Sequence, residues 1–246
     1  MSDVPLSVCI PAYGAARYIG AALESVLAQI PAGAEVIVAD DASTDATAEI
    51  AERFGAPVRV LRLPHGGPGA AFNAAVAASS GRLLAAVDAD DLWVAGKIDA
   101  QLAALGEDPS LDAVFGQVVE FRTPELPVEA TARWQCRSEP HRGLLRGTMM
   151  LRRSAWDRVG PLPIDLAVGE FIAWYAAAID RGLKVRMLDQ VVLARRIHGD
   201  NTMLRVADRA GGYLRVVKAA LDRRRATGDG RLEPDAIPTI PGETVR

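Results

Sequence analysis

The sequence predicts an α/β fold with a mostly parallel central sheet flanked by helices on both faces. Three observations carry this prediction. Short apolar runs alternate with helix-patterned segments over residues 6–88, each intervening segment is long enough for a crossover helix, and 50% of the 246 residues are apolar. In such sheets, ligands collect at the carboxyl ends of the strands. We therefore expect functional side chains to follow the predicted strands.

Four apolar runs in the N-terminal half predict strands, and the segments between them predict helices. EVIVAD at 35–40 is rich in β-branched residues, and VRVLRLP at 58–64 alternates apolar and polar residues. Between the runs, apolar residues recur at helical spacing, and Gly or Pro marks the ends. We expect strands at 6–13, 35–40, 58–64 and 82–88, with helices at 17–29, 41–55 and 66–81.

The C-terminal half has a less regular pattern. Ser154 is predicted to cap a helix, and the polar, Pro-rich chain after Gly228 predicts a loose tail. We expect a strand at 112–121, a loop at 122–141, a short strand and then a helix in 143–160, a helix at 169–182, one or two strands in 184–201 and a basic amphipathic helix at 205–226.

Composition narrows the classes of protein to consider. The formal net charge of −3 and the sequence pI of about 5.7 give no electrostatic footprint for nucleic acid. Cys9 and Cys136 are far apart and predict reduced thiols. No apolar run approaches the roughly 18 residues that a spanning helix needs, and no signal peptide is visible. We expect a cytoplasmic protein and leave contact with a membrane surface open.

The stretch AAVDADDLW at 85–93 places three carboxylates within four positions. Like charges this close repel unless a cation lies among them, and carboxylate oxygens are the ligands that Mg²⁺ and Mn²⁺ prefer. The alternative is a helix start, where Asp residues cap free N–H groups. Because Tyr13, Asp40 and Asp41 also follow predicted strands, their convergence at one sheet edge favours the metal site.

Four motifs occur in a specific order: PAYG at 11–14, ADDASTDAT at 39–47, a Gly-rich turn before FNAAV at 72–76, and VDADDLW at 87–93. Together they resemble the inverting, nucleotide-sugar-dependent glycosyltransferases with the GT-A fold, the large glycosyltransferase family 2. The resemblance covers roughly residues 5–200. It implies a domain over 1–204, with a nucleotide-binding half at 1–93 and an acceptor-side half at 94–204, followed by the C-terminal helix and tail at 205–246.

The resemblance also implies a role for individual residues. A Mn²⁺ or Mg²⁺ ion held by Asp90, with Asp88 and His198, would neutralise the charge on the leaving diphosphate. The donor is a nucleotide sugar, with UDP-sugars favoured, and the acceptor is a saccharide, a lipid-linked glycan, a peptide or a metabolite. The donor contacts implied are Pro11, Tyr13, Asp40, Asp41, Asn73, Asp88, Ala89 and Arg196.

Three positions depart from the family pattern. Ala42 replaces a glycine, a minor change if the backbone there is right-handed. Phe72 replaces an arginine, so a cationic contact is either missing or supplied from elsewhere. Phe171 stands where the resemblance expects an Asp after Glu170, as the general base that takes the acceptor proton. We expect Glu170 to be the base, with Asp165 as the second candidate.

Other functions stay open on the sequence. A non-catalytic relative that binds a nucleotide sugar fits the departures at 72 and 171. A nucleotidyltransferase would need a Gly-rich basic loop after the first strand, where PAYGAARY offers only Gly14 and Arg17. A dinucleotide-dependent dehydrogenase is disfavoured because no GxGxxG follows that strand.

Overall fold

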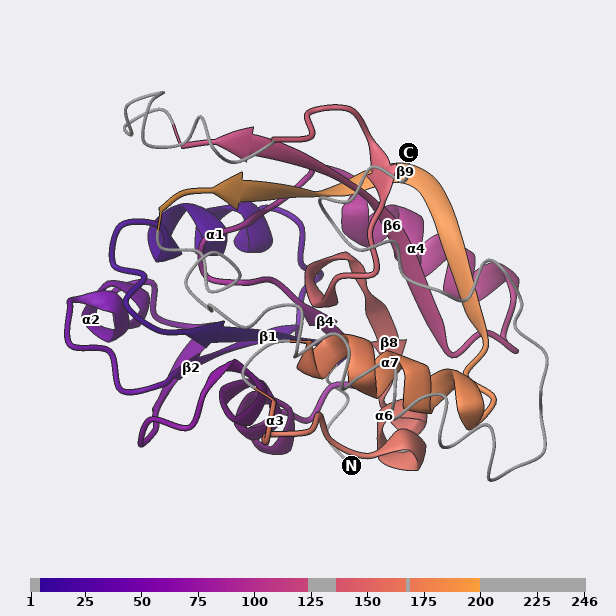
Figure 1. Ribbon diagram of the computed structural model, residues 1–246, viewed down its shortest axis with the longest axis horizontal. Helices are drawn as coiled ribbons and strands as arrows, with labels where there is room; N and C mark the ends of the chain where they lie inside the picture. Colours follow the sequence, from indigo (N-terminus) through magenta and orange to yellow (C-terminus); the bar gives the residue numbers. More distant parts are fainter. Residues whose placement is uncertain (1–4, 124–135, 167–168, 200–246) are drawn as a thin grey trace.

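The computed structural model describes residues 5–123, 136–166 and 169–199 (Figure 1). The predicted helix at 205–226, the tail after Gly228 and most of the predicted loop at 122–141 lie outside these ranges. Within them, no helix combines the length and the apolar character needed to cross a membrane.

One mixed sheet organises the described part of the chain. Its strands are β1 Leu6–Ala12, β2 Glu35–Asp40, β3 Val58–Arg62, β4 Leu83–Ala86, β5 Leu92–Trp93, β6 Ala113–Arg122, β7 His141–Arg142, β8 Met150–Arg152 and β9 Val185–Ile197. The strand order is β3-β2-β1-β4-β8-β6-β9-β5, with β7 paired to β6. β1 to β4 pair in parallel, as predicted. β8 then pairs antiparallel with both β4 and β6, and β9 runs parallel to β6.

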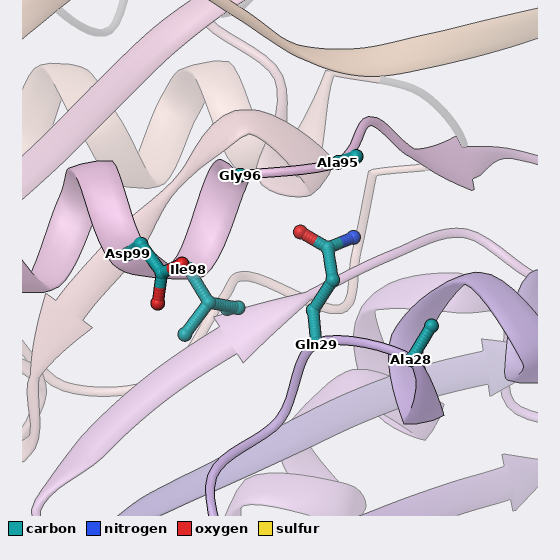
Figure 2. Close-up of a pocket in the computed structure, with 6 residues that line it drawn as sticks. All are labelled: Ala28, Gln29, Ala95, Gly96, Ile98 and Asp99. Carbon is teal, nitrogen blue, oxygen red and sulfur yellow. The ribbon is translucent and has the colours of Figure 1, made fainter.

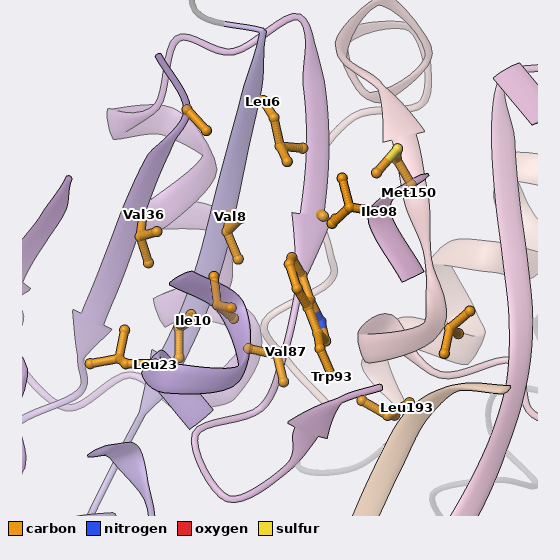
Figure 3. Close-up of a cluster of buried hydrophobic side chains, with 14 of the residues drawn as sticks. Leu6, Val8, Ile10, Leu23, Val36, Val87, Trp93, Ile98, Met150 and Leu193 are labelled. Atoms are coloured by element: carbon orange, nitrogen blue, oxygen red, sulfur yellow. The ribbon is translucent and has the colours of Figure 1, made fainter. Parts of the chain in front are cut away.

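Helices cover both faces of this sheet. They are α1 Ile19–Leu27, α2 Thr47–Glu52, α3 Pro68–Ala78, α4 Lys97–Glu107, the 3₁₀ turn η1 Arg146–Thr148, α6 Arg153–Val159 and α7 Glu170–Asp180. Side chains alternate along β1, so Val8 and Ile10 pack with α1 and α4 (Figure 3), whereas Cys9 packs with α3, α6 and α7. The molecule is therefore a three-layer arrangement with an apolar core on each face of the sheet.

Some local predictions are wrong. Helix α2 begins at Thr47 rather than at 41, because the preceding residues form a turn whose Ser43 and Asp45 side chains accept hydrogen bonds from the loop after β1. Helix α6 begins at Arg153 with Arg152 at its N-cap, so Ser154 lies inside the helix and is not its cap. The pattern also did not predict α4, which has two polar residues, Lys97 and Gln101, among its buried side chains.

Lys97, the first residue of α4, is completely buried. Its Nζ donates to the carbonyl oxygen of Gly147 at 3.1 Å and lies 5.2 Å from the centroid of the Trp93 ring. No carboxylate pairs with Lys97 among the described residues. Burial lowers the pKa of Lys97 to about 7, because the interior disfavours the charged ammonium group.

We expect the free energy of unfolding to rise less with pH, between pH 7 and 10, in Lys97→Met than in the wild-type chain. The folded-state pKa of about 7 lies below the value of the unfolded chain, so above pH 7 the unfolded state binds more protons than the folded state. The contribution of Lys97 to the free energy of unfolding therefore rises with pH, by up to about 1.4 kcal/mol per unit, until the unfolded lysine also loses its proton near pH ~10.4. Urea unfolding of both proteins between pH 7 and 10 measures this slope.

The matched control for this test is Lys184→Met, because Lys184 is exposed. It should keep the slope of the wild-type chain. Parallel pH profiles for the wild-type chain and Lys97→Met would contradict the assignment of the slope to Lys97.

Candidate active site

The predicted site residues of the N-terminal half meet at one edge of the sheet. β1 and β2 pair in parallel with Ala12 opposite Asp40, and β4 lies on the other side of β1. Tyr13, Asp41 and Asp88 therefore follow neighbouring parallel strands at their carboxyl ends, while Pro11 lies buried within β1. This is the edge at which parallel sheets bind ligands.

Hydrogen bonds hold the loop after β1 in place. The backbone N–H groups of residues 14, 15 and 16 donate in turn to the side chains of Ser43, Thr47 and Asp45, at 3.0, 2.8 and 3.1 Å. Ala42, in the same turn, has a φ of 62°, which is in the left-handed region. The replacement of glycine would have been a minor change only with a right-handed backbone, so here it costs free energy. The strain of a non-glycine residue there is on the order of 1 kcal/mol.

An aromatic platform lies beside this loop. Tyr13 is 56% exposed, and the centroid of its ring lies 4.9 Å from that of His65. The Nδ1 atom of His65 lies 2.9 Å from Oδ2 of Asp41. No sequence motif marks His65, which enters the site only because the chain after β3 returns to the end of β2. The exposed ring of Tyr13 can stack on a planar base.

Asp40 and Asp41 have different surroundings although they are adjacent. The Asp41 carboxylate accepts from the backbone N–H groups of Gly66 and Gly67 at 2.7 and 2.9 Å, so it fixes the Gly-rich turn before α3. Asp40 Oδ2 accepts from the N–H of Ser43 at 3.3 Å, whereas its buried Oδ1 has no hydrogen-bond partner in the described residues. A buried acceptor without a partner is costly, which makes Asp40 the better placed of the two to accept from a ligand.

The start of α3 supports the site rather than lining it. The side chain of Asn73 both donates to and accepts from the backbone of Leu162, at 2.9 Å each way, so the predicted donor contact is engaged in joining two segments. Phe72 is fully buried, with its ring packed edge-on against Trp156. Position 72 therefore belongs to the core.

The three carboxylates after β4 face three different partners. Asp88 accepts from Nη2 of Arg146 at 2.6 Å, and Asp90 Oδ2 lies 2.9 Å from Nε2 of His198. Asp91 is buried and accepts from the backbone N–H of Arg196 at 2.8 Å. Burial raises the pKa of Asp91, and the charges of Asp90 and Asp88 raise it further. Asp91 thus fixes β9, while Asp88 and Asp90 remain at the site; Ala89 between them is buried.

The end of β9 brings Arg196 and His198 to this cluster of carboxylates. Arg196 donates from Nε to the carbonyl oxygen of Asp90 at 3.0 Å, and its guanidinium lies over the rings of Tyr18 and Phe121. The ring of His198 also packs against Tyr18, with centroids 4.6 Å apart. Arg196 and His198 therefore lie beside Asp90.

Asp90 and His198 fit a divalent ion that the protein holds by few ligands. The described residues contain no group of three or more His, Cys, Asp or Glu side chains able to hold a metal. Mg²⁺-type sites commonly use one or two protein ligands and complete the shell with substrate phosphates and water. The pair is suited to that pattern, with an imidazole nitrogen 2.9 Å from an oxygen of Asp90, whose side chain is partly exposed.

Glu170 approaches the cluster from the other half of the chain. It is the first residue of α7, its side chain is 12% exposed, and its Oε1 lies 3.5 Å from Nη1 of Arg146. Burial alone would lower the pKa of Arg146, but Asp88 and Glu170 more than offset this and raise it, so the guanidinium stays charged. Phe171 packs on Phe115 and Trp174 in the core, so this position faces away from the site. Asp165 is exposed and has no hydrogen bond or ion pair within the described ranges.

A separate cavity of about 250 Å³ lies between the end of α1 and the start of α4 (Figure 2). It is lined by Ala28, Gln29, Ala95, Gly96, Ile98 and Asp99. None of these residues belongs to the predicted site.

Residues 7–160 match the family model described as glycosyl transferase family 2. Among similar proteins is the UDP-Glc:alpha-D-GlcNAc-diphosphoundecaprenol beta-1,3-glucosyltransferase of Escherichia coli, 35% identical over 107 residues, which are 43% of this chain and 42% of that protein. Chondroitin synthase of Pasteurella multocida is 27% identical over 235 residues, 91% of this chain and 24% of that protein. The chain thus spans less than half the length of these curated relatives.

Solved structures share the fold. The crystal structure of S. aureus TarS 1–349 in complex with UDP-GlcNAc superposes with a TM-score of 0.70 at 22% identity, covering 94% of this chain and 69% of that one. The mannosyltransferase PcManGT from Pyrobaculum calidifontis, in complex with GDP-Man and Mn²⁺, gives a TM-score of 0.64 at 21% identity, covering 93% and 66%. These likenesses confirm the predicted GT-A fold.

Proposed function

The chain belongs to glycosyl transferase family 2, and from this premise we propose that it transfers a sugar from a UDP-sugar to an acceptor, with inversion at the anomeric carbon. One observation carries the proposal: a single sheet edge gathers an aromatic platform, the Asp90–His198 pair and the Glu170 carboxylate. These are the parts that binding a nucleotide, holding its diphosphate and accepting a proton require.

The platform and Asp40 suit a uracil base. Tyr13 offers an exposed ring for stacking, and the buried Oδ1 of Asp40 is an acceptor that can take the N–H of a pyrimidine ring. Two proteins named above point to such a donor, since the E. coli glucosyltransferase is named for UDP-Glc and the TarS structure is a complex with UDP-GlcNAc. A UDP-sugar is therefore the donor that we propose.

We propose that Asp90 and His198 hold a Mn²⁺ or Mg²⁺ ion, with Asp88 close by. When bound, the ion neutralises the charge that builds on the leaving diphosphate. Arg196, whose guanidinium is fixed against Tyr18 and Asp90, is placed to add a cationic contact to a phosphate oxygen. The solved structure of PcManGT with Mn²⁺ supports a metal in this fold.

Glu170 is the proposed general base. The acceptor oxygen forms a bond to the anomeric carbon as the bond from that carbon to the phosphate oxygen breaks, the acceptor proton passes to the Glu170 carboxylate, and UDP leaves with the bonding electrons. Glu170 is nearly buried and bonded to Arg146, whereas Asp165 is exposed and has no such partner among the described residues. The acceptor and the cytoplasmic location stay predictions.

A donor screen tests this function. We expect UDP-glucose or UDP-N-acetylglucosamine with Mn²⁺ to raise the melting temperature, since a ligand at 100 times its Kd stabilises by about 2.7 kcal/mol. UMP at the same concentration is the control that lacks the diphosphate, and EDTA removes the metal. No shift with any UDP- or GDP-sugar in the presence of Mn²⁺ would refute donor binding. Bound donor that never releases UDP would favour a non-catalytic relative, and pyrophosphate release from a nucleoside triphosphate would favour a nucleotidyltransferase.

A further inference from the structure

A cation occupies the place next to position 72, although the arginine expected there is missing. The ring of Phe72 lies 5.1 Å from Cζ of Arg146, so the guanidinium packs over the aromatic face. Arg146 comes from η1, a different element in the other half of the chain. The cation missing from the motif is thus supplied by a residue that no motif marks.

Arg146 contacts two carboxylates, one from each half of the site. Its Nη2 lies 2.6 Å from Oδ1 of Asp88, after β4, and its Nη1 lies 3.5 Å from Oε1 of Glu170, at the start of α7. The arginine side chain is only 8% exposed. The shorter contact makes Asp88 the firm anchor, and the longer one reaches toward Glu170.

The turn that carries Arg146 is held by side chains of α4. Lys97 Nζ donates to the carbonyl oxygen of Gly147 at 3.1 Å, and Gln101 Nε2 donates to that of Thr148 at 2.8 Å. Gly147 leaves no spare room, because a Cβ there would lie 3.0 Å from a methyl group of Leu193. The backbone at Arg146 is therefore fixed from two sides, which preorganises the guanidinium.

We propose that Arg146 is a positioning residue that, anchored on Asp88, holds the Glu170 carboxylate in place to accept the acceptor proton. This role rests on the proposed function of Glu170. A base acts only within hydrogen-bonding reach of the proton that it takes, and a displacement of about 1 Å can cost on the order of 100-fold in rate. Arg146 acts through Glu170 and makes no bond to the reacting atoms.

A double-mutant cycle on turnover tests the dependence on Glu170. The readout is UDP release from the donor that the screen identifies. We expect Arg146→Met to lower kcat by about 100-fold, with a smaller change in donor KM, and Arg146→Lys to recover part of the loss. Combined with Glu170→Gln, Arg146→Met should lower kcat by no more than about threefold further, because a positioning residue has nothing left to position.

A second cycle, on unfolding of the ligand-free chain, needs no turnover. With Arg146 present, Glu170→Gln removes a charge partner of a buried cation and should lower the melting temperature by about 2–4 °C. In the Arg146→Met background the two carboxylates have lost the cation between them, so the same change should cost clearly less or nothing.

The matched background is Arg152→Met. Arg152 also makes partly buried hydrogen bonds, to the carbonyl oxygens of Leu105 and Leu111, and among the described residues its hydrogen bonds reach no site residue. There, Glu170→Gln should cost as much as in the wild-type chain. Additive losses in either cycle overturn the role of Arg146 while leaving donor binding intact. Failure of the wild-type chain to bind any nucleotide sugar overturns the proposed function and this role together.

Discussion

Glu170→Gln is expected to lower the rate of sugar transfer by a factor of about 10² to 10⁴, the usual contribution of general base catalysis. The substitution keeps the size and shape of the side chain and its place at the start of α7 but removes the group that accepts a proton. Donor affinity should change by no more than about threefold, because Glu170 contacts Arg146 rather than the aromatic platform. Initial rates of UDP release with a panel of acceptors, together with calorimetric donor binding, separate the two effects.

The variant Asp165→Asn tests whether Asp165, rather than Glu170, is the general base. Asp165 is exposed and makes no hydrogen bond or ion pair within the described ranges, so we expect its loss to leave the rate nearly unchanged. A large loss in Asp165→Asn with normal turnover in Glu170→Gln would assign the base to the loop before α7. Full activity of Glu170→Gln and of Asp165→Asn alike would contradict both candidates.

The parallel half of the fold could be predicted closely from the sequence. Parallel strands buried on both faces appear as short, continuous apolar runs, and the run EVIVAD coincides with β2 residue for residue. Helix α4 could not be predicted in this way, because Lys97 and Gln101 interrupt its apolar face and are buried through hydrogen bonds to backbone carbonyls. The antiparallel insertion of β8 between β4 and β6 depends on long-range pairing that a local pattern does not contain.

The site shows the same division between local and long-range information. Asp88, Asp90 and His198 belong to motifs, and the structure brings Asp90 and His198 together although 108 positions separate them. Arg146 stands in a stretch with other arginines, and only the packing of η1 against β4 reveals its contact with Asp88. His65 likewise gains its neighbours Tyr13 and Asp41 from the sheet order. Phe171 looked like a lost base from its place in the motif, yet its side chain lies in the core.

Asp90→Asn is expected to weaken Mn²⁺-dependent donor binding by at least about 100-fold. Removing a group that only supports a metal ligand already costs 10- to 100-fold in metal affinity, so the loss of a direct carboxylate ligand should cost at least as much. The carboxylate has an oxygen 2.9 Å from Nε2 of His198, and the amide keeps its volume but loses its charge. Calorimetric titration of the donor with and without Mn²⁺ measures the change, and the metal-independent part of binding should survive.

Asp91→Asn is the control for a neighbouring carboxylate that is not proposed to ligate the ion. Asp91 is adjacent in sequence and is also a carboxylate, but it is buried and accepts from the backbone of Arg196, so its loss should affect stability while Mn²⁺-dependent donor affinity stays within about threefold. Because the two substitutions make the same carboxylate-to-amide change at neighbouring positions, only ligation predicts a large difference between them. Equal losses of donor affinity in both variants, or an unchanged Mn²⁺ dependence in Asp90→Asn, would remove Asp90 from the metal site.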